Sequence, residues 1–194
     1  METITEMEKK ETPRSGPEER ETDFSLVIEE HQRQVYSLAL RLTGNEAAAD
    51  DITQETFISA WKNFKGFRGD SSLRTWLLRI ATNKVRSYWC WKKLRAWVGL
   101  GPREDDEEAP ALEEMLPDNP AGRPEQAAMA ADLERRVQAA INALPPRQRE
   151  VAALRAQGLS GAEISETLGM AEGTVKAHWF EARKKLEASL GEYL

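Results

Sequence analysis

The stretch that most constrains the fold lies between Ser160 and Leu186, where a short helical pattern, a glycine and a longer helical pattern follow each other. Ser160 and Glu163 have the spacing of a capping box, in which a hydroxyl and a carboxylate satisfy opposite backbone donors at a helix start. Gly169 can supply a left-handed turn at no steric cost. Val175 then returns to the apolar side of the second helix. This order predicts a helix-turn-helix.

Helical spacing also governs the first half of the chain. Apolar residues recur at steps of three and four from Phe24, Gly44 ends the first helix, and Asn45 can cap the second. A long third helix is expected over residues 72–97, and no stretch of this half alternates with period two, so no sheet is expected. The inner faces of the second and third helices are predicted to hold Ala49, Ile52, Thr53, Thr56, Phe57, Ala60, Trp61, Leu73, Trp76, Leu77, Ile80, Ala81, Lys84, Val85 and Tyr88.

Composition divides the chain into four parts. Residues 1–23 have few apolar anchors and are expected to form a disordered tail. Residues 24–97 form the first helical domain, and residues 125–194 form the second, which contains the helix-turn-helix. Residues 98–124 hold several prolines and few bulky apolar side chains, which is typical of a linker. The sequence therefore predicts an all-α protein of two small domains joined by a flexible acidic linker.

Charge is unevenly distributed along the chain. The formal net charge of −6 argues weakly against a nucleic-acid ligand. However, residues 62–95 hold ten Lys or Arg and one acid, whereas residues 103–125 hold nine acids and two Arg. Such blocks carry information that the average hides. They favour nucleic-acid binding by the first domain, with an acidic segment behind it.

Several classes of protein are disfavoured. No apolar run approaches the roughly 18 residues that a membrane span needs. The charged N-terminal stretch has no apolar core like that of a signal peptide, so the cytoplasm is the expected location. Cys90 is the single cysteine, and His31 and His178 lie far apart, so we expect no disulfide and no metal site. No paired-carboxylate, triad or phosphate-loop pattern points to an enzyme or to a cofactor.

The second helix of the helix-turn-helix has an outward face that could read DNA. In this motif the start of the second helix projects into the major groove. The outward residues near that start are Thr174, Lys176, Ala177 and His178, and Arg183, Lys184 and Lys185 follow near the expected phosphate backbone. Trp179 is expected to point into the core. A plain amphipathic helix with solvated cations is the alternative.

Two stretches of the chain resemble one family. Residues 144–186, "LPPRQREVAALRAQGLSGAEISETLGMAEGTVKAHWFEARKKL", are similar to the C-terminal domain of extracytoplasmic-function (ECF) sigma factors of the sigma-70 family, and also to the DNA-binding domain of LuxR-type regulators. Residues 31–88 decide between the two, because "DDITQETFISAW" and "FRGDSSLRTWLLRIATN" are typical of the promoter-melting domain of the same sigma factors. The chain as a whole therefore resembles an ECF sigma factor.

The resemblance implies which residues contact the polymerase. In the family, the helix that holds "DITQETF" docks on the coiled-coil of the largest subunit of core RNA polymerase. The resemblance therefore implies that Asp51, Gln54 and Glu55 are the polar residues that contact this coiled-coil. These acids have an alternative explanation, since negative charge near a helix N-terminus is favoured by the macrodipole. Phe57 and Trp61 are expected in the core.

The resemblance also implies a −10 promoter site on the loop "KGFRGDSS" and the helix after it. Melting a duplex requires cations for the phosphates and platforms for extruded bases. The residues assigned to this site are Phe67, Arg68, Asn83, Lys84 and Arg86. Phe67 is expected to be exposed, and Trp76 is expected in the core rather than stacked on a base. Tyr88, Trp89 and Trp91 fit single-strand binding as well as packing against the other domain or an inhibitor.

The −35 element would be read by Thr174, Lys176, Ala177, His178 and Arg183. The polymerase flap and an anti-sigma factor are further expected partners.

The linker resembles the family's connector, which leads toward the RNA path. Polymerisation would belong to the partner, and two weak DNA contacts would act together on one polymerase. The alternatives are a LuxR-type regulator that binds duplex DNA without replacing sigma, and a helical adaptor that binds only protein.

Overall fold

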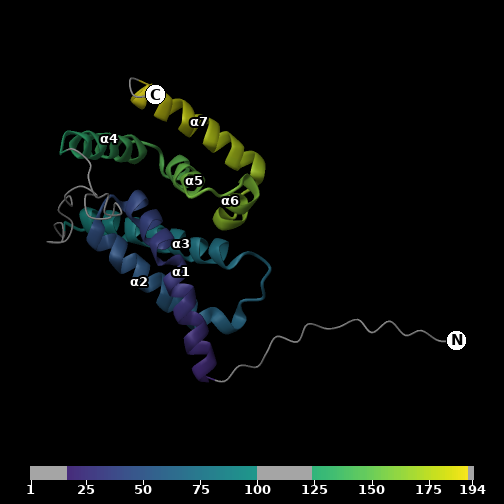
Figure 1. Ribbon diagram of the computed structural model, residues 1–194. Helices are drawn as coiled ribbons and strands as arrows, with labels where there is room; N and C mark the ends of the chain where they lie inside the picture. The colour runs from purple at the N-terminus through teal and green to yellow at the C-terminus, as the bar shows by residue number, and fades with distance from the viewer. Residues whose placement is uncertain (1–16, 100–123, 192–194) are drawn as a thin grey trace.

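The protein folds into α-helices throughout the part that the structure describes (Figure 1). The computed structural model describes residues 17–99 and 124–191, with side chains from residue 24 and again from residue 132. Seven α-helices and one short 3-10 helix, η1, lie in these two ranges, which contain no strand. Their bounds are α1 Pro17–Thr43, α2 Glu46–Asn63, η1 Phe64–Gly66, α3 Leu73–Trp97, α4 Pro124–Asn142, α5 Pro146–Ala156, α6 Gly161–Leu168 and α7 Glu172–Leu190.

The first helix begins earlier than expected. Helix α1 starts at Pro17, seven residues before the predicted start at Phe24, so the end of the predicted tail is helical. Proline suits a first helical position because its fixed φ is already helical and its missing N–H would have no partner there. Residues 1–16 of the predicted tail and residues 100–123 of the predicted linker lie outside the described residues.

Helices α1, α2 and α3 form the N-terminal half, and their boundaries follow the predicted caps. Gly44 adopts φ 68°, which ends α1. The Asn45 side chain accepts a hydrogen bond from the Ala48 amide at the start of α2. At the start of α3 the Ser72 hydroxyl does the same for the Thr75 amide. Local side-chain chemistry therefore fixes where these helices begin.

The predicted inner faces are mostly correct, although one residue is exposed and six are half-buried. Ala49, Ile52, Thr56, Phe57, Ala60, Leu77, Ala81 and Val85 are buried. Trp61 was expected in the core, but it is 42% exposed. Its ring lies against Phe24, with 5.1 Å between centroids, at the edge of the half. Thr53, Leu73, Trp76, Ile80, Lys84 and Tyr88 are half-buried.

Helices α4 to α7 form the C-terminal half and contain the predicted helix-turn-helix. The Ser160 hydroxyl accepts from the Glu163 amide, and the Glu163 carboxylate accepts from the Ser160 amide, which confirms the capping box. Gly169 adopts the left-handed conformation with φ 64° at the end of α6. Val175 is fully buried, so α7 is anchored across α6 as predicted.

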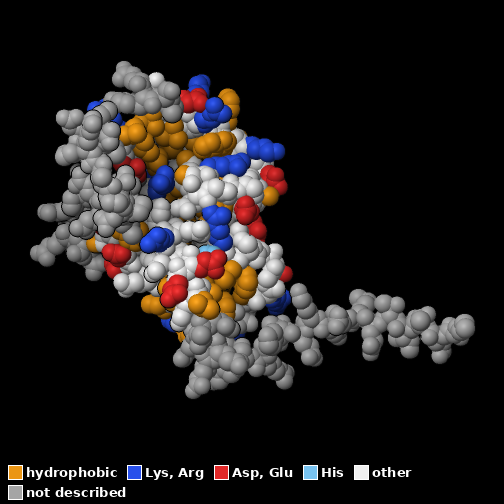
Figure 2. Space-filling model, in the orientation of Figure 1, with side chains coloured by type: hydrophobic (Ala, Val, Ile, Leu, Met, Phe, Trp, Pro, Cys, Tyr) orange, Lys and Arg blue, Asp and Glu red, His pale blue; other side chains and the backbone are white. Residues whose placement is uncertain are grey.

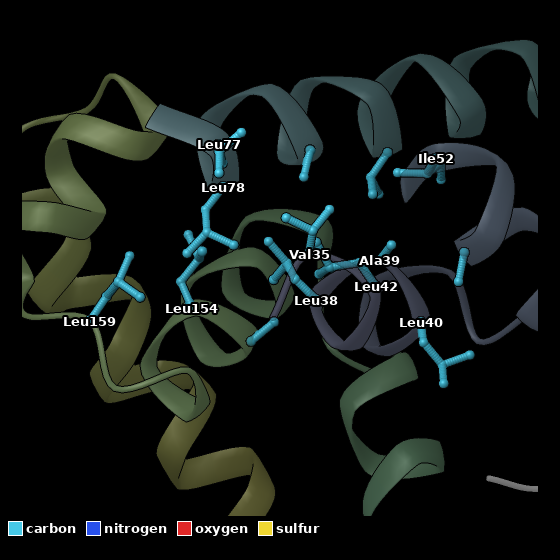
Figure 3. Close-up of a cluster of buried hydrophobic side chains, with 14 of the residues drawn as sticks. Val35, Leu38, Ala39, Leu40, Leu42, Ile52, Leu77, Leu78, Leu154 and Leu159 are labelled. Atoms are coloured by element: carbon cyan, nitrogen blue, oxygen red, sulfur yellow. The ribbon is translucent and has the colours of Figure 1, made fainter. Parts of the chain in front are cut away.

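The two halves pack against each other around a shared apolar core. Leu154 and Leu159 come from the C-terminal half, and Figure 3 shows them directed toward Leu38 and Leu78 of the N-terminal half. All four side chains are at most 1% exposed. Burying a leucine completely stabilises a fold by about 1.5–3 kcal/mol. The contact between the halves is therefore built like a domain interior in this conformation.

Candidate nucleic-acid interface

The start of α7 presents the residues predicted to read the −35 element. Thr174, Lys176 and Ala177 are exposed, and His178 is half-buried. The turn before α7 is stabilised by Ser165, whose hydroxyl donates to the Met170 carbonyl at 2.6 Å. This hydrogen bond closes the turn between α6 and α7. Lys176 forms no ion pair with any residue that the structure describes, so its ammonium is available to an anion.

Further along α7, three consecutive cations, Arg183, Lys184 and Lys185, lie between Glu181 and Glu187. Arg183 is exposed and pairs with Glu187 one turn later, with 2.6 Å between Nε and Oε1. Figure 2 shows blue Lys and Arg side chains along the part of the surface that α7 occupies in Figure 1. Trp179 is half-buried rather than fully buried, and the Arg155 guanidinium lies 6.0 Å from its ring centroid. Phe180 is 68% exposed, which the helical pattern did not indicate.

The loop between α2 and α3 holds the first of the predicted −10 residues. Phe67 was expected to be exposed, but it is half-buried and packs against Trp76 in a tilted arrangement, with 5.1 Å between centroids. Trp76 was expected in the core and is likewise half-buried. Apolar burial explains the pairing, because each ring covers part of the other at the surface. Arg68 in the same loop is exposed.

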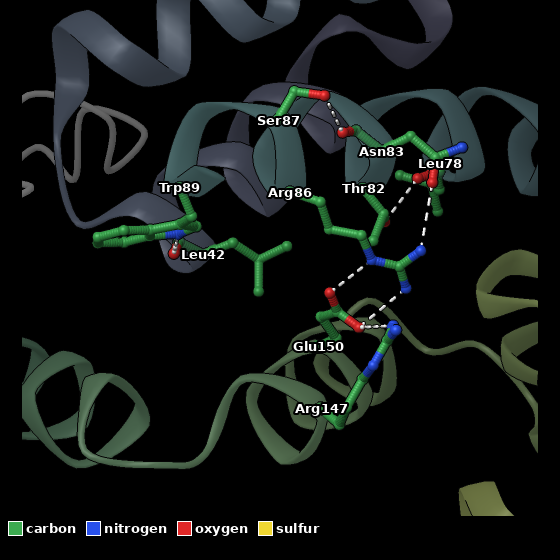
Figure 4. Close-up of polar contacts among 9 residues, drawn as sticks. All are labelled: Leu42, Leu78, Thr82, Asn83, Arg86, Ser87, Trp89, Arg147 and Glu150. Atoms are coloured by element: carbon green, nitrogen blue, oxygen red, sulfur yellow. Dashed lines mark hydrogen bonds and ion pairs between the residues drawn. The ribbon is translucent and has the colours of Figure 1, made fainter. Parts of the chain in front are cut away.

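The middle of α3 carries the other predicted −10 residues, and two of them form ion pairs. Asn83 is exposed and accepts a hydrogen bond from Arg86 at 3.2 Å. The Lys84 ammonium lies 2.9 Å from the Glu55 carboxylate of α2. Arg86 does not point into solvent but toward the C-terminal half. Its Nε and Nη2 donate to the two carboxylate oxygens of Glu150 at 2.8 and 2.9 Å (Figure 4).

The environment of Glu150 explains why Arg86 is held there. Glu150 lies in α5 and its side chain is 9% exposed. The Arg147 guanidinium lies 3.0 Å from the same carboxylate, one turn earlier on α5. The hydrogen bond to Glu150 raises the pKa of Arg86 above its usual value. A carboxylate this buried needs a cation, and the planar guanidinium of Arg86 satisfies both of its oxygens.

A second polar contact between the halves involves Gln157, which follows α5. Its side-chain amide donates to the Ser37 hydroxyl of α1 at 3.2 Å. The Arg74 guanidinium of α3 donates to its backbone carbonyl. No sequence motif pointed to Glu150, Arg147 or Gln157. Glu150 and Arg86 are 64 residues apart, and helical periodicity gives no information about pairs at that separation.

The aromatic residues late in α3 have different environments. Trp89 is half-buried, and its indole N–H donates to the Leu42 carbonyl of α1 at 3.2 Å. The Arg149 guanidinium of α5 lies 5.9 Å from the Trp89 ring centroid. Tyr88 packs edge-on against Trp89 at 5.4 Å. Trp91, in contrast, is 65% exposed. Trp89 therefore packs within the molecule, while Trp91 is left open to a ligand.

The predicted polymerase-binding residues share an exposed face of α2. Asp51, Gln54 and Glu55 are all exposed, and they lie on the helix face opposite buried Ile52 and Phe57.

No cluster of metal-ligating side chains occurs among the described residues. None of the described helices is both long and apolar enough to cross a bilayer.

Known families match both halves of the chain. Sigma-70 region 2 matches residues 27–93, which lie within α1 to α3. Sigma-70 region 4 matches residues 134–186, which run from α4 into α7. The ECF RNA polymerase sigma-E factor of Haemophilus influenzae is 32% identical over 167 residues, which cover 84% of this chain and 85% of the relative. The chain belongs to the ECF sigma factors. Matches to both regions disfavour the LuxR-type alternative.

Other ECF sigma factors extend the comparison. SigG of Mycobacterium tuberculosis is 34% identical over 186 residues, which cover 90% of this chain and 50% of SigG. The chain therefore spans about half the length of that relative. Among solved structures, the sigma factor RpoE of Bartonella quintana, crystallised with the anti-sigma factor NepR, gives a TM-score of 0.71 at 24% identity over 89% of this chain and 99% of RpoE. This likeness confirms the all-α fold. Helices α1–α3 thus form the region 2 half of the molecule, and helices α4–α7 form its region 4 half.

Proposed function

We propose that this ECF sigma factor binds core RNA polymerase and directs it to promoters, with the region 2 half melting the −10 element and the region 4 half reading the −35 element. The pairing of both sigma regions in one chain, in this order, is the observation that carries the proposal. The chemistry of polymerisation belongs to the polymerase. We place this work in the cytoplasm, with the polymerase.

The exposed face of α2 is the proposed polymerase contact. Asp51, Gln54 and Glu55 offer two carboxylates and an amide within about one helical turn. Such a face suits a basic partner helix, which here is the coiled-coil of the largest polymerase subunit. The region 4 half is proposed to contact the polymerase flap. The two contacts place both halves on one polymerase, so each DNA contact acts at a high effective concentration.

Promoter recognition is assigned to two surfaces. On the region 2 half, Arg68 and Lys84 contact phosphates and Asn83 reads a base edge, while Phe67 leaves Trp76 to stack on an extruded base. Arg86 joins this surface when it leaves Glu150. On the region 4 half, the exposed start of α7 enters the major groove, where Lys176 and His178 reach bases, Thr174 and Ala177 line the contact, and Arg183 binds a phosphate.

An anti-sigma factor is the other proposed partner. The solved relatives with this fold include RpoE bound to NepR and CnrH bound to the cytosolic domain of CnrY. Exposed apolar side chains on the present chain, such as Trp91 and Phe180, offer area for a protein of this kind. Binding would be measured with the purified candidate inhibitor and would reduce transcription in proportion to occupancy.

Run-off transcription with purified core polymerase tests the function. We expect transcripts from a subset of a genomic promoter library only when this chain is added. A triple change to alanine at Asp51, Gln54 and Glu55 should abolish polymerase binding. The matched control changes exposed Glu29 and Gln32 of α1 to alanine and should leave binding intact. Polymerase binding without any transcript would contradict the proposal, and so would tight, specific duplex binding by the chain alone.

A further inference from the structure

The contact between the two halves uses a residue that the proposed function needs elsewhere. Arg86 is assigned to the −10 surface, yet both oxygens of Glu150 accept from it at 2.8 and 2.9 Å. We name Arg86, Arg147 and Glu150 the Glu150 cluster (Figure 4). A guanidinium bound in this bidentate way cannot also bind a phosphate in the same geometry. Arg86 therefore has two mutually exclusive partners.

We propose that the Glu150 cluster holds the free sigma factor in a closed, autoinhibited conformation, and that promoter single strand opens it by replacing Glu150 on Arg86. This inference rests on the proposed −10 function. Phosphate and carboxylate compete for the same donors, because both accept paired hydrogen bonds from a guanidinium. The Glu150 carboxylate keeps the Arg147 guanidinium, 3.0 Å away, so it is not left without a cation when Arg86 departs.

Three other contacts act in the same direction as the Glu150 cluster. The Gln157 side chain donates to Ser37 of α1. The Gln138 side chain of α4 donates to the Arg41 carbonyl of α1 at 3.0 Å. Arg149 lies over the ring of Trp89. Each joins the region 4 half to the region 2 half, so opening the molecule breaks them together, and closure is cooperative.

The inhibition is one-sided. Arg86, on the −10 surface, is held across the contact, whereas Thr174, Lys176 and Ala177 at the start of α7 remain exposed in the closed form. Closure should therefore weaken single-strand binding and leave duplex binding by α7 unchanged. If one free molecule in ten is open, the apparent affinity for single strand falls about tenfold.

Electron–electron distance measurements on the full chain test the closed state directly. Cys90 on α3 is the single cysteine and is exposed, and Ser189→Cys adds an exposed site on α7. We expect one narrow distance distribution for the parent protein and a broad, longer one for Glu150→Gln. The matched control is Asp132→Asn, which removes a carboxylate that pairs with Arg136 on the same helix and should keep the narrow distribution. A broad distribution in the parent, or a narrow one in Glu150→Gln, overturns the proposal.

Affinity for single-stranded oligo(dT) tests the competition. We expect Glu150→Gln to bind about five- to tenfold more tightly than the parent. Gln157→Ala should shift affinity in the same direction without changing any charge, which separates opening from electrostatics and keeps the test valid if Glu150→Gln folds poorly. Saturating oligo(dT) should broaden the parent's distance distribution. Open variants with unchanged oligo(dT) affinity overturn the competition. Run-off transcription, measured separately, decides the sigma function itself.

Discussion

The region 2 half and the region 4 half present their candidate promoter residues in opposite ways. In the region 4 half, the start of α7 is exposed, and Lys176 forms no ion pair with any described residue. In the region 2 half, Lys84 pairs with Glu55, Arg86 pairs with Glu150, and Phe67 packs against Trp76. The surface of α7 proposed to read DNA is thus accessible without rearrangement. The surface proposed to melt the promoter must first exchange these intramolecular partners.

The difference is consistent with the two tasks. Reading duplex DNA requires a preformed surface, because a rigid helix fits the major groove without reorganisation. Bases and phosphates of the single strand become available only as the duplex opens, so groups on the proposed melting surface can keep intramolecular partners until then. Side chains of this surface that pair within the protein when DNA is absent can then bind the single strand of the melted promoter.

Leu154→Ala should have the largest effect, because it removes buried volume at the contact between the halves. Leu154 is 0% exposed within the shared core. The free energy of unfolding should fall by about 2–5 kcal/mol. Chemical denaturation followed by circular dichroism measures it. Leu133→Ala on α4, where the side chain is 44% exposed, is the control and should stay within about 0.5 kcal/mol of the parent. An equal loss in both variants would show that the halves do not share a core.

Arg86→Ala and Lys176→Ala should separate the two surfaces. Arg86→Ala leaves a buried carboxylate with one cation fewer and should cost about 1–3 kcal/mol of stability. It should also weaken single-strand binding. Lys176→Ala should change stability by less than about 0.5 kcal/mol and weaken only duplex binding to the −35 element. Denaturation curves and fluorescence anisotropy with both DNA forms measure this pair. Equal destabilisation by the two changes would remove the contrast.

Ser160→Ala tests the N-cap of α6, the helix that packs against α7. Loss of the hydroxyl that accepts from the Glu163 amide should cost about 0.5–2 kcal/mol of unfolding free energy, measured by chemical denaturation.

Hydrogen bonds from Ser160, chiefly from its backbone amide, lower the pKa of Glu163. The Glu163 carboxylate therefore stabilises the fold above the ordinary carboxyl pKa, and this contribution is lost as the pH falls through the lowered pKa of Glu163. Denaturation at several pH values should show this loss in the parent and not in Glu163→Gln.

Glu187→Gln should have the smallest effect and refines the description of α7. Arg183 pairs with Glu187 at the surface. Such exposed pairs one helical turn apart contribute about 0.3–0.5 kcal/mol. Freeing Arg183 should leave stability nearly unchanged and strengthen duplex binding slightly, with a steeper salt dependence. Anisotropy titrations at several salt concentrations measure the slope. Weaker binding would mean that Glu187 positions Arg183 for its phosphate.

Local chemistry allowed most helix boundaries to be predicted. Asn45, Ser160 and Gly169 act through neighbours within a few residues, so their roles are visible in the sequence and are confirmed by the structure. The start of α1 was predicted at Phe24 rather than Pro17, because the residues before Phe24 lack apolar periodicity. The assigned promoter and polymerase residues remain predictions, and the structure shows where each one lies.

The order of residues was enough to predict the all-α class, the helix-turn-helix and the family, because caps, periodicity and motifs depend on residues that are close along the chain. The packing of the helices places Trp61 at the surface, Phe67 against Trp76, and Arg86 beside Glu150. These outcomes depend on how helices distant in sequence pack. A guanidinium at the surface of one half becomes an interdomain contact only when the other half places a buried carboxylate 2.8 Å away.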